Sequence, residues 1–200
     1  FMAAYSGDRY AGLTEYMLYG GLPLVVLKEN EDEKASMLET LFQEIYLRDI
    51  YLRHNVKNQD ELEDLLNVIS SSIGSLTNPE KLQKTFRSRK NSRITSATIK
   101  KYLGYLEDSF LVESASRYDI KGKEYIETPK KYYFSDLGLR NARLNFRQFE
   151  ENHAMENVIY NELKMRGYHV DVGVNFVSEK EESGKQIRTA LEVDFVCNKG

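Results

Sequence analysis

Apolar residues recur at three- and four-residue intervals along the first 55 residues, which predicts helices. Leu13, Tyr16 and Met17 form a first stripe, and the sequence Gly20-Gly-Leu-Pro23 interrupts it. A second stripe follows at Met37, Leu38, Leu41, Phe42 and Ile45. Because glycine and proline end helices, this pattern predicts two helical segments that each bury one face.

The next part of the chain, up to Phe134, has the pattern of three short helices followed by two strands. Leu62, Leu65, Leu66 and Ile69 form the stripe of the first helix. Asn78-Pro79 and Thr95-Ser96 are typical starts of the second and third helices. Residues 111–119 and 130–134 are rich in β-branched or aromatic residues and flank a polar tip, Lys121-Gly-Lys123. Three helices and a hairpin predict a winged-helix domain.

The distribution of charge suggests that this domain binds DNA, because residues 81–101 contain eight basic residues and no Asp or Glu. Such a patch neutralises phosphates and releases counterions, and the third helix of a winged helix presents its N-terminal residues to the major groove. Lys130 and Lys131 add charge to the expected wing. Docking of this face onto an acidic partner remains an alternative. The residues predicted to contact double-stranded DNA are Arg93, Ser96, Thr98, Lys100, Lys101, Lys121 and Lys123.

The last 48 residues have a helix-strand-strand pattern that carries acidic residues. A helix is predicted over 152–166, with an apolar stripe at Met155, Val158, Ile159 and Leu163. Glu162 lies on this stripe and is expected to pair with Arg166 one turn later, whereas Glu156 can point toward a neighbouring sheet. Strands are predicted over 168–174 and 191–196, around a polar hairpin tip at 178–184.

Glu192 and Asp194 fall on one face of the final strand because side chains alternate along a strand. Two carboxylates on one face repel unless a cation or a base lies between them. The strand therefore suggests a metal site, although a solvent-exposed face would show the same pattern.

The composition predicts a globular, cytoplasmic protein. The chain has 200 residues, 41% of them apolar, and a net charge of -3. The single Cys197 excludes a disulfide framework, and no apolar run approaches the ~20 residues that span a bilayer. The scattered histidines have no second ligand at zinc spacing. Because Phe1 is not an initiator, we expect a fragment cut at both ends.

Two resemblances follow from these motifs. Glu156, Gly167-Tyr-His-Val170 and Glu192-Val-Asp-Phe-Val196 look like the N-terminal half of the PD-(D/E)xK nuclease fold. Nearly the whole chain also resembles the C-terminal region of a prokaryotic family of AAA-type ATPases. The motifs of this second resemblance are Tyr19-Gly-Gly-Leu-Pro23, Tyr46-Leu-Arg-Asp-Ile50, Thr98-Ile-Lys-Lys-Tyr-Leu-Gly-Tyr-Leu-Glu107, Lys131-Tyr-Tyr-Phe-Ser-Asp-Leu-Gly-Leu-Arg-Asn141 and Glu156-Asn-Val-Ile-Tyr-Asn-Glu-Leu163.

The resemblances imply an α+β chain in three parts. These are a helical linker region at 1–58 after a missing ATPase domain, a winged-helix domain at 59–136, and a truncated nuclease-like α/β domain at 137–200. Glu156 and Asp194 would hold Mg²⁺, with Glu192 as an accessory catalytic acid. ATP would bind the missing domain, because no phosphate-binding loop sequence occurs here. The acid-x-Lys strand of the nuclease would begin just past Gly200.

Three functions therefore remain open from the sequence. The first is DNA binding by part of an ATP-dependent protein, whose further partners would be its own ATPase domain and a second copy of the chain. The second is a magnesium-dependent nuclease at full length. The third is a degenerate nuclease fold that serves protein interaction or oligomerisation. Without the acid-x-Lys pair, this chain alone is expected to be catalytically inactive.

Overall fold

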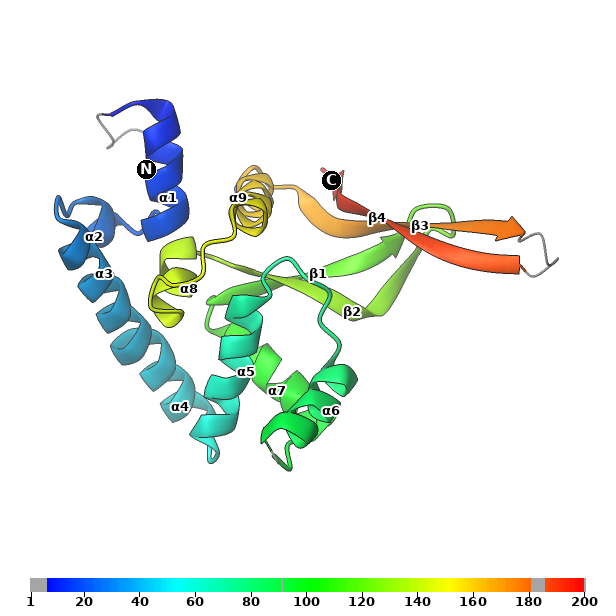
Figure 1. Cartoon of the computed structure of the whole chain (residues 1–200), viewed down its shortest axis with the longest axis horizontal. Coiled ribbons are helices and arrows are strands. Elements are labelled where there is room, and N and C mark those ends of the chain that lie inside the picture. The colour runs from blue at the N-terminus through cyan, green and yellow to red at the C-terminus, as the bar shows by residue number, and fades with distance from the viewer. Residues whose placement is uncertain (1–6, 91, 181–185, 200) are drawn as a thin grey trace.

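The chain is an α+β fold in the computed structural model: helices pack around one end of a single mixed sheet, and the other end of the sheet extends beyond them (Figure 1). The structure describes residues 7–90, 92–180 and 186–199, so most of the expected hairpin tip at 178–184 lies outside the described residues. None of the described helices is both long and apolar enough to cross a membrane. The elements are α1 Arg9–Tyr19, α2 Pro23–Val26, α3 Glu31–Thr40, η1 Leu41–Leu47, α4 Arg48–His54, α5 Gln59–Ser71, α6 Pro79–Lys90, α7 Ser96–Asp108, β1 Val112–Asp119, β2 Glu124–Phe134, α8 Leu137–Arg143, α9 Glu151–Met165, β3 His169–Lys180 and β4 Gln186–Asn198.

The second predicted helical segment is one long helix made of α3, η1 and α4 (Figure 1). Asn30 caps its start by accepting hydrogen bonds from the backbone N–H groups of Asp32 and Glu33. Its middle, η1, is a π-helix. The helix buries Leu38, Phe42, Leu47 and Ile50.

The helices α5, α6 and α7 precede the β1–β2 hairpin in the predicted order. Asn78 accepts hydrogen bonds from the backbone of Glu80 and Lys81 at the start of α6, and Thr95 accepts one from Thr98 at the start of α7. Both predicted caps are thus confirmed. Thr77, just before α6, forms an isolated bridge with Lys130 of β2. This bridge joins the helices to the hairpin.

The four strands form one sheet in the order β2-β1-β3-β4. β1 and β2 are antiparallel, β1 and β3 are parallel, and β3 and β4 are antiparallel. The hairpin that was expected to be a wing therefore continues into the strands of the expected nuclease-like part. The sheet draws strands from both sides of the boundary predicted after residue 136.

The helix α8 connects the N-terminal helices to the sheet through buried polar groups. Asp136 caps α8 and also accepts a 2.7 Å hydrogen bond from the backbone N–H of Gly21. Asn141 donates to the carbonyl oxygens of Met17 and Leu18. Gly20 has φ +75°, and a Cβ there would lie 2.0 Å from Asp136 Oδ1. Two motifs far apart in the sequence thus pack directly together, at a position where only glycine fits.

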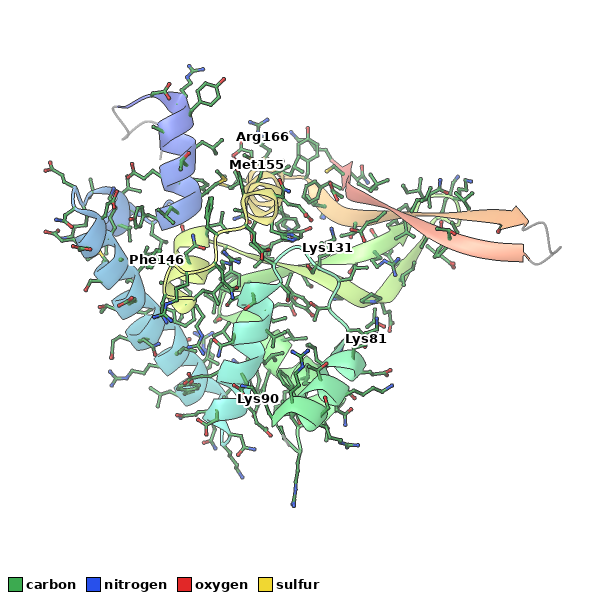
Figure 2. All side chains as sticks on the ribbon, in the orientation of Figure 1. Lys81, Lys90, Lys131, Phe146, Met155 and Arg166 are labelled. Atoms are coloured by element: carbon green, nitrogen blue, oxygen red, sulfur yellow. The ribbon has the colours of Figure 1, made fainter. Side chains whose placement is uncertain are left out.

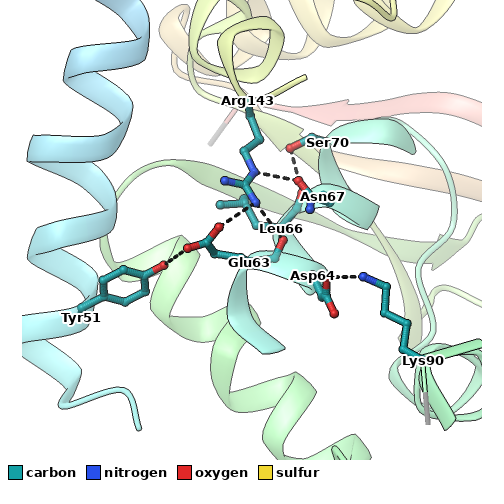
Figure 3. Close-up of polar contacts among 8 residues, drawn as sticks. All are labelled: Tyr51, Glu63, Asp64, Leu66, Asn67, Ser70, Lys90 and Arg143. Carbon is teal, nitrogen blue, oxygen red and sulfur yellow. Dashed lines mark hydrogen bonds and ion pairs between the residues drawn. The ribbon is translucent and has the colours of Figure 1, made fainter. Parts of the chain in front are cut away.

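A polar network fastens α8 to the helices α4 and α5 (Figure 3). Arg143 donates to Asn67 Oδ1 at 2.8 Å and pairs with Glu63 at 3.3 Å. Tyr51 donates a 2.8 Å hydrogen bond to the other oxygen of the Glu63 carboxylate. Both Glu63 oxygens are therefore occupied, which fixes the spacing of the three helices.

Candidate functional site

The helix α9 is held on β2 by an amide that makes two backbone hydrogen bonds. Asn157 is fully buried, donates to the Phe134 carbonyl at 2.7 Å and accepts from the Phe134 N–H at 2.8 Å. This pairing sets the buried face at Ala154, Asn157 and Tyr160. The predicted stripe is wrong at Ile159, which is 43% exposed. The hydrogen bonds of the Asn157 amide orient the helix so that Ile159 faces away from the sheet.

Glu156 and Glu162 of α9 have different surroundings, as the sequence suggested. Glu162 is exposed and pairs with Arg166 at 2.7 Å, which confirms the predicted i,i+4 pair. Glu156 lies one turn before Tyr160 and points toward the sheet, where it accepts hydrogen bonds from Lys131 and Tyr133.

A bulge in β4 brings Phe195 to the side of the sheet that carries Asp194 and α9. Asp171 and Gly173 of β3 pair with Val196 and Val193, so Asp194 and Phe195 together face one residue of β3. Consecutive side chains of a regular strand point to opposite faces, and a bulge removes this alternation. Phe195 accordingly packs against the Tyr133 ring, at 6.2 Å between centroids, while Asp194 reaches the same side.

The three predicted acidic residues converge on one lysine, and we call this group the acidic cluster: Glu156, Glu192, Asp194 and Lys131. The Lys131 Nζ lies 2.9 Å from Glu156 Oε1, 2.7 Å from Glu192 Oε1 and 3.9 Å from Asp194 Oδ1. Lys131 is only 3% exposed, and Figure 2 shows it next to α9 and over the sheet. The cation or base that the strand pattern required is thus a side chain of β2.

Lys131 and Tyr133 are held in defined protonation states by their surroundings. Burial lowers the pKa of the Lys131 ammonium, but its contacts with Glu192 and Glu156 outweigh burial and keep the pKa above the usual value. Burial, together with the 2.7 Å hydrogen bond to Glu156, raises the pKa of Tyr133. At neutral pH the lysine is therefore a cation and the tyrosine a hydrogen-bond donor.

Sequence reasoning missed Lys131, which it assigned to the charge of an exposed wing. That assignment is wrong, because the side chain is buried among carboxylates. A signal was present: Lys131 lies two residues before Tyr133 and so shares a strand face with a buried aromatic residue. A lysine on a buried face needs a negatively charged partner.

The acidic cluster does not fit a metal ion as it stands. Within residues 7–90, 92–180 and 186–199, no group of three or more His, Cys, Asp or Glu side chains is arranged to hold one. Magnesium prefers an octahedron of oxygens, and an ammonium among the carboxylates takes the position of the ion. The magnesium-binding roles of Glu156 and Asp194 remain predictions from the sequence.

The second candidate site is a basic surface on α6 and α7. We call it the α6–α7 basic surface, and its members, all exposed, are Lys81, Lys84, Arg87, Arg89, Lys90, Arg93, Lys100 and Lys101. In the described part of the chain, Lys90 is the one member that pairs with a carboxylate, that of Asp64 (Figure 3). Lys101 lies over the Tyr105 ring, 5.6 Å from its centroid. The remaining members project their charge into solvent.

The predicted DNA contacts on α7 and in the segment just before it fall into two groups. Arg93 and Lys100 are exposed, as Lys101 is. Ser96 and Thr98 are half-buried and take part in the start of the helix: the Ser96 N–H donates to Gln83, and the Thr98 hydroxyl shares a hydrogen bond with Thr95. The cations are available for phosphates, whereas the Thr98 hydroxyl already has a protein partner.

The structure does not bring Lys121 and Lys123 to the same surface. They lie in the turn between β1 and β2, where Asp119 accepts hydrogen bonds from the backbone of Lys121 and Gly122. The Ile120 N–H donates to the Val174 carbonyl of β3. In Figure 1 this turn lies beside the β3–β4 hairpin, on the other side of the sheet's centre from α7.

Comparison with known proteins gives a family and two relatives. Residues 10–150 match DUF8612, described as a domain of unknown function. An uncharacterized protein of Haemophilus influenzae is 35% identical over 186 residues, which cover 90% of this chain and 46% of the relative. An uncharacterized protein of Methanocaldococcus jannaschii is 26% identical, over 92% of this chain and 38% of the relative. The chain thus spans less than half of the length of these relatives. No solved structure matches it.

Proposed function

We propose a function from the geometry, because this chain belongs to the DUF8612 family and the description of that family states none. The chain binds double-stranded DNA through the α6–α7 basic surface. Contacts with phosphates supply the affinity, and Arg93 and Lys100 contribute most of it. No base preference is included in this proposal.

The observation that carries the proposal is the lack of internal partners for these cations. Seven members of the surface have no carboxylate within ion-pair distance among the described residues: Lys81, Lys84, Arg87, Arg89, Arg93, Lys100 and Lys101. Elsewhere, the cations Lys28, Arg48 and Arg166 each pair with a nearby glutamate, although single exposed cations such as Lys57 and Arg147 also have no carboxylate partner among the described residues. A concentration of unpaired cations in a chain of net charge -3 favours a polyanionic ligand.

The arrangement of α5, α6, α7 and the β1–β2 hairpin supports the winged-helix part of the proposal. The bridge between Thr77 and Lys130 adds a short strand contact between the first two helices and the hairpin. In this proposal α7 is the recognition helix, since its apolar residues Ile99, Leu103 and Leu106 are buried and leave Lys100 outside.

The resemblance to AAA-type ATPases completes the proposal for the whole protein. The described relatives are more than twice as long as the aligned region, which leaves room for an ATP-binding domain. In this proposal the winged helix delivers DNA to that domain, and a nuclease-like fold follows it. ATP binding and any nuclease activity are thus proposed for the full-length protein and not for the present chain.

Fluorescence anisotropy with a labelled 20-base-pair duplex tests the proposal. We expect salt-dependent binding, and we expect the double variant Arg93→Glu/Lys100→Glu to bind about ten- to a hundredfold more weakly. The slope of log affinity against log salt should fall in magnitude by ~2, because two phosphate contacts are lost.

The matched control is Lys28→Glu/Arg48→Glu, which changes the net charge by the same amount. Lys28 is half-buried and Arg48 is exposed, and they pair with Glu33 and Glu44 at 3.3 and 3.5 Å. This control should keep most of the affinity. An equal loss in both double variants would show that only net charge matters, and an absence of duplex binding by the native chain would refute the proposal.

A second function, a protein-interaction or oligomerisation module, is favoured by an apolar patch on the sheet. Leu191 and Val193 of β4 are 51% and 45% exposed, and Ile120 is 40% exposed. A Cβ on Gly173 would lie 3.0 Å from Val193 and 3.1 Å from Ile120, so the patch is continuous. Light scattering of the native chain and of Leu191→Lys/Val193→Lys tests this function. A native monomer at high concentration would contradict self-association.

A further inference from the structure

We propose that Lys131 is the resident cation of the acidic cluster and replaces a divalent metal ion there. Its ammonium joins α9 to β4 in the folded protein without any metal. This inference is independent of DNA binding, because it rests on a different set of residues. Its consequence is that the position between the carboxylates is closed to magnesium in the native chain.

The three carboxylates come from two elements, α9 and β4. These elements can pack side by side only if a cation offsets the repulsion between the carboxylates. Glu156 is in α9, while Glu192 and Asp194 are in β4, and all three point toward the same atom. Like charges at such distances repel, and the repulsion is strongest for the least exposed member. The Glu156 side chain is 16% exposed, whereas that of Asp194 is 70% exposed and solvated. Glu156 therefore depends most on the cation.

The position of Lys131 meets the electrostatic need of the cluster. Its Nζ contacts Glu156 and Glu192 at 2.9 and 2.7 Å, which are distances of charge-assisted hydrogen bonds. A magnesium ion bound to the same two oxygens would sit ~2.1 Å from each and within a few ångström of the ammonium. Two cations that close repel each other. A magnesium ion could therefore bind these two oxygens only after displacing the ammonium.

Neighbouring groups hold the lysine and the glutamate in this arrangement. Tyr133 donates a 2.7 Å hydrogen bond to Glu156 Oε1, the same oxygen that Lys131 contacts. The Tyr133 ring stacks on Tyr160 of α9, with centroids 4.2 Å apart. On the other side, a Cβ on Gly74 would lie 3.1 Å from Glu156 Oε2, so the carboxylate has little room to turn. Because its neighbours hold the Lys131–Glu156 contact in one geometry, a covalently attached cation suits this position better than an exchangeable metal ion.

The test is a titration with Mn²⁺ and Mg²⁺, followed by calorimetry, of the native chain and of Lys131→Met. Methionine removes the charge and keeps most of the volume. We expect no saturable binding to the native chain, and one new site in the variant with an affinity at least about tenfold above any native background. The double variant Lys131→Met/Glu192→Gln should lose the new site.

The matched control is Lys130→Met, which removes the neighbouring charge. Lys130 contacts Ser114 at 3.5 Å and has no carboxylate partner among the described residues, so its variant should gain no site. Saturable binding to the native chain that Glu156→Gln abolishes would overturn the proposal. So would a Lys131→Met variant that gains nothing.

Folding of the variant is itself informative. If Lys131→Met does not fold in metal-free buffer, circular dichroism should show that Mn²⁺ restores its helical signal, because the ion supplies the missing positive charge. A variant that stays unfolded at saturating Mn²⁺ would also contradict the inference. The native chain should keep its unfolding midpoint in EDTA.

Discussion

The α6–α7 basic surface and the acidic cluster both concentrate charge, but they handle it in opposite ways. On the surface, Arg93 and Lys100 are exposed and lack carboxylate partners among the described residues. In the cluster, Lys131 is buried and lies within 4 Å of three carboxylates. In Figure 2, Lys81 and Lys90 are on α6, whereas Lys131 lies beside α9.

The difference separates charge that is available to a ligand from charge that the fold uses. A cation that already pairs with a carboxylate inside the protein gains little from binding a phosphate, because the carboxylate would then lose its counter-charge. A solvated cation keeps its charge free for a polyanion and adds little to stability. We therefore expect substitutions in the cluster to change stability and substitutions on the surface to change binding.

The largest expected effect is that of Lys131→Met on stability. Removing the cation that contacts three carboxylates, one of them mostly buried, should lower the free energy of unfolding by about 3–5 kcal/mol in EDTA. Urea denaturation followed by circular dichroism measures the loss. The control Lys100→Met makes the same chemical change on α7 and should cost less than about 0.5 kcal/mol. Similar losses in both variants would erase the contrast between the two regions.

A smaller loss is expected for Glu156→Gln. The amide keeps the size of the side chain and can still accept from Tyr133, but Lys131 then has only the more exposed Glu192 and Asp194 as partners. We expect a cost of about 1–3 kcal/mol. Glu162→Gln on the same helix is the control, since its i,i+4 pair with Arg166 is exposed and worth ~0.5 kcal/mol. Equal costs would mean that Lys131 does not depend on Glu156.

Much of the fold could be predicted from the sequence, because local signals set the elements. The caps at Asn78, Thr95 and Asp136 mark helix starts by hydrogen bonds within three residues, and such contacts leave a clear local pattern. The parallel pairing of β1 with β3 has no such pattern, because it joins residues more than 50 positions apart. Strand order in the sheet was therefore not predictable from periodicity.

The site shows the same division. Alternation predicted that Glu192 and Asp194 share a face and need a cation, but it could not name Lys131, which lies about 60 residues earlier. The bulge in β4 was also invisible to an alternation rule, since it places Phe195 with Asp194 rather than opposite it. Likewise, the Lys121 and Lys123 turn was grouped with α7 because a free wing was assumed, whereas Ile120 bonds to β3.

The comparison can be sharpened by testing the turn against α7 in duplex binding. Lys121→Glu/Lys123→Glu changes the net charge as much as Arg93→Glu/Lys100→Glu does. Because the Ile120 N–H attaches the turn to β3 rather than to α7, we expect the affinity to change by no more than about threefold at 0.1 M salt, where interactions between exposed charges are screened beyond ~10 Å. Anisotropy with the same duplex measures both variants. An equally large loss from the turn would extend the DNA-binding surface to the hairpin, as the sequence predicted.

The smallest effect is expected for Lys90→Met, which we compare with Arg93→Met on the same α6–α7 basic surface. Lys90 pairs with Asp64 and its side chain is 50% exposed, so Lys90→Met should change stability by less than about 0.5 kcal/mol. In duplex binding, Lys90→Met should also reduce the slope of log affinity against log salt by less than Arg93→Met does. The reason is that a phosphate must first displace the Asp64 carboxylate from Lys90. Anisotropy across a salt series separates the two. If both variants lower the slope equally, internal pairing does not decide which cations bind DNA, and the distinction between the two regions would rest on burial alone.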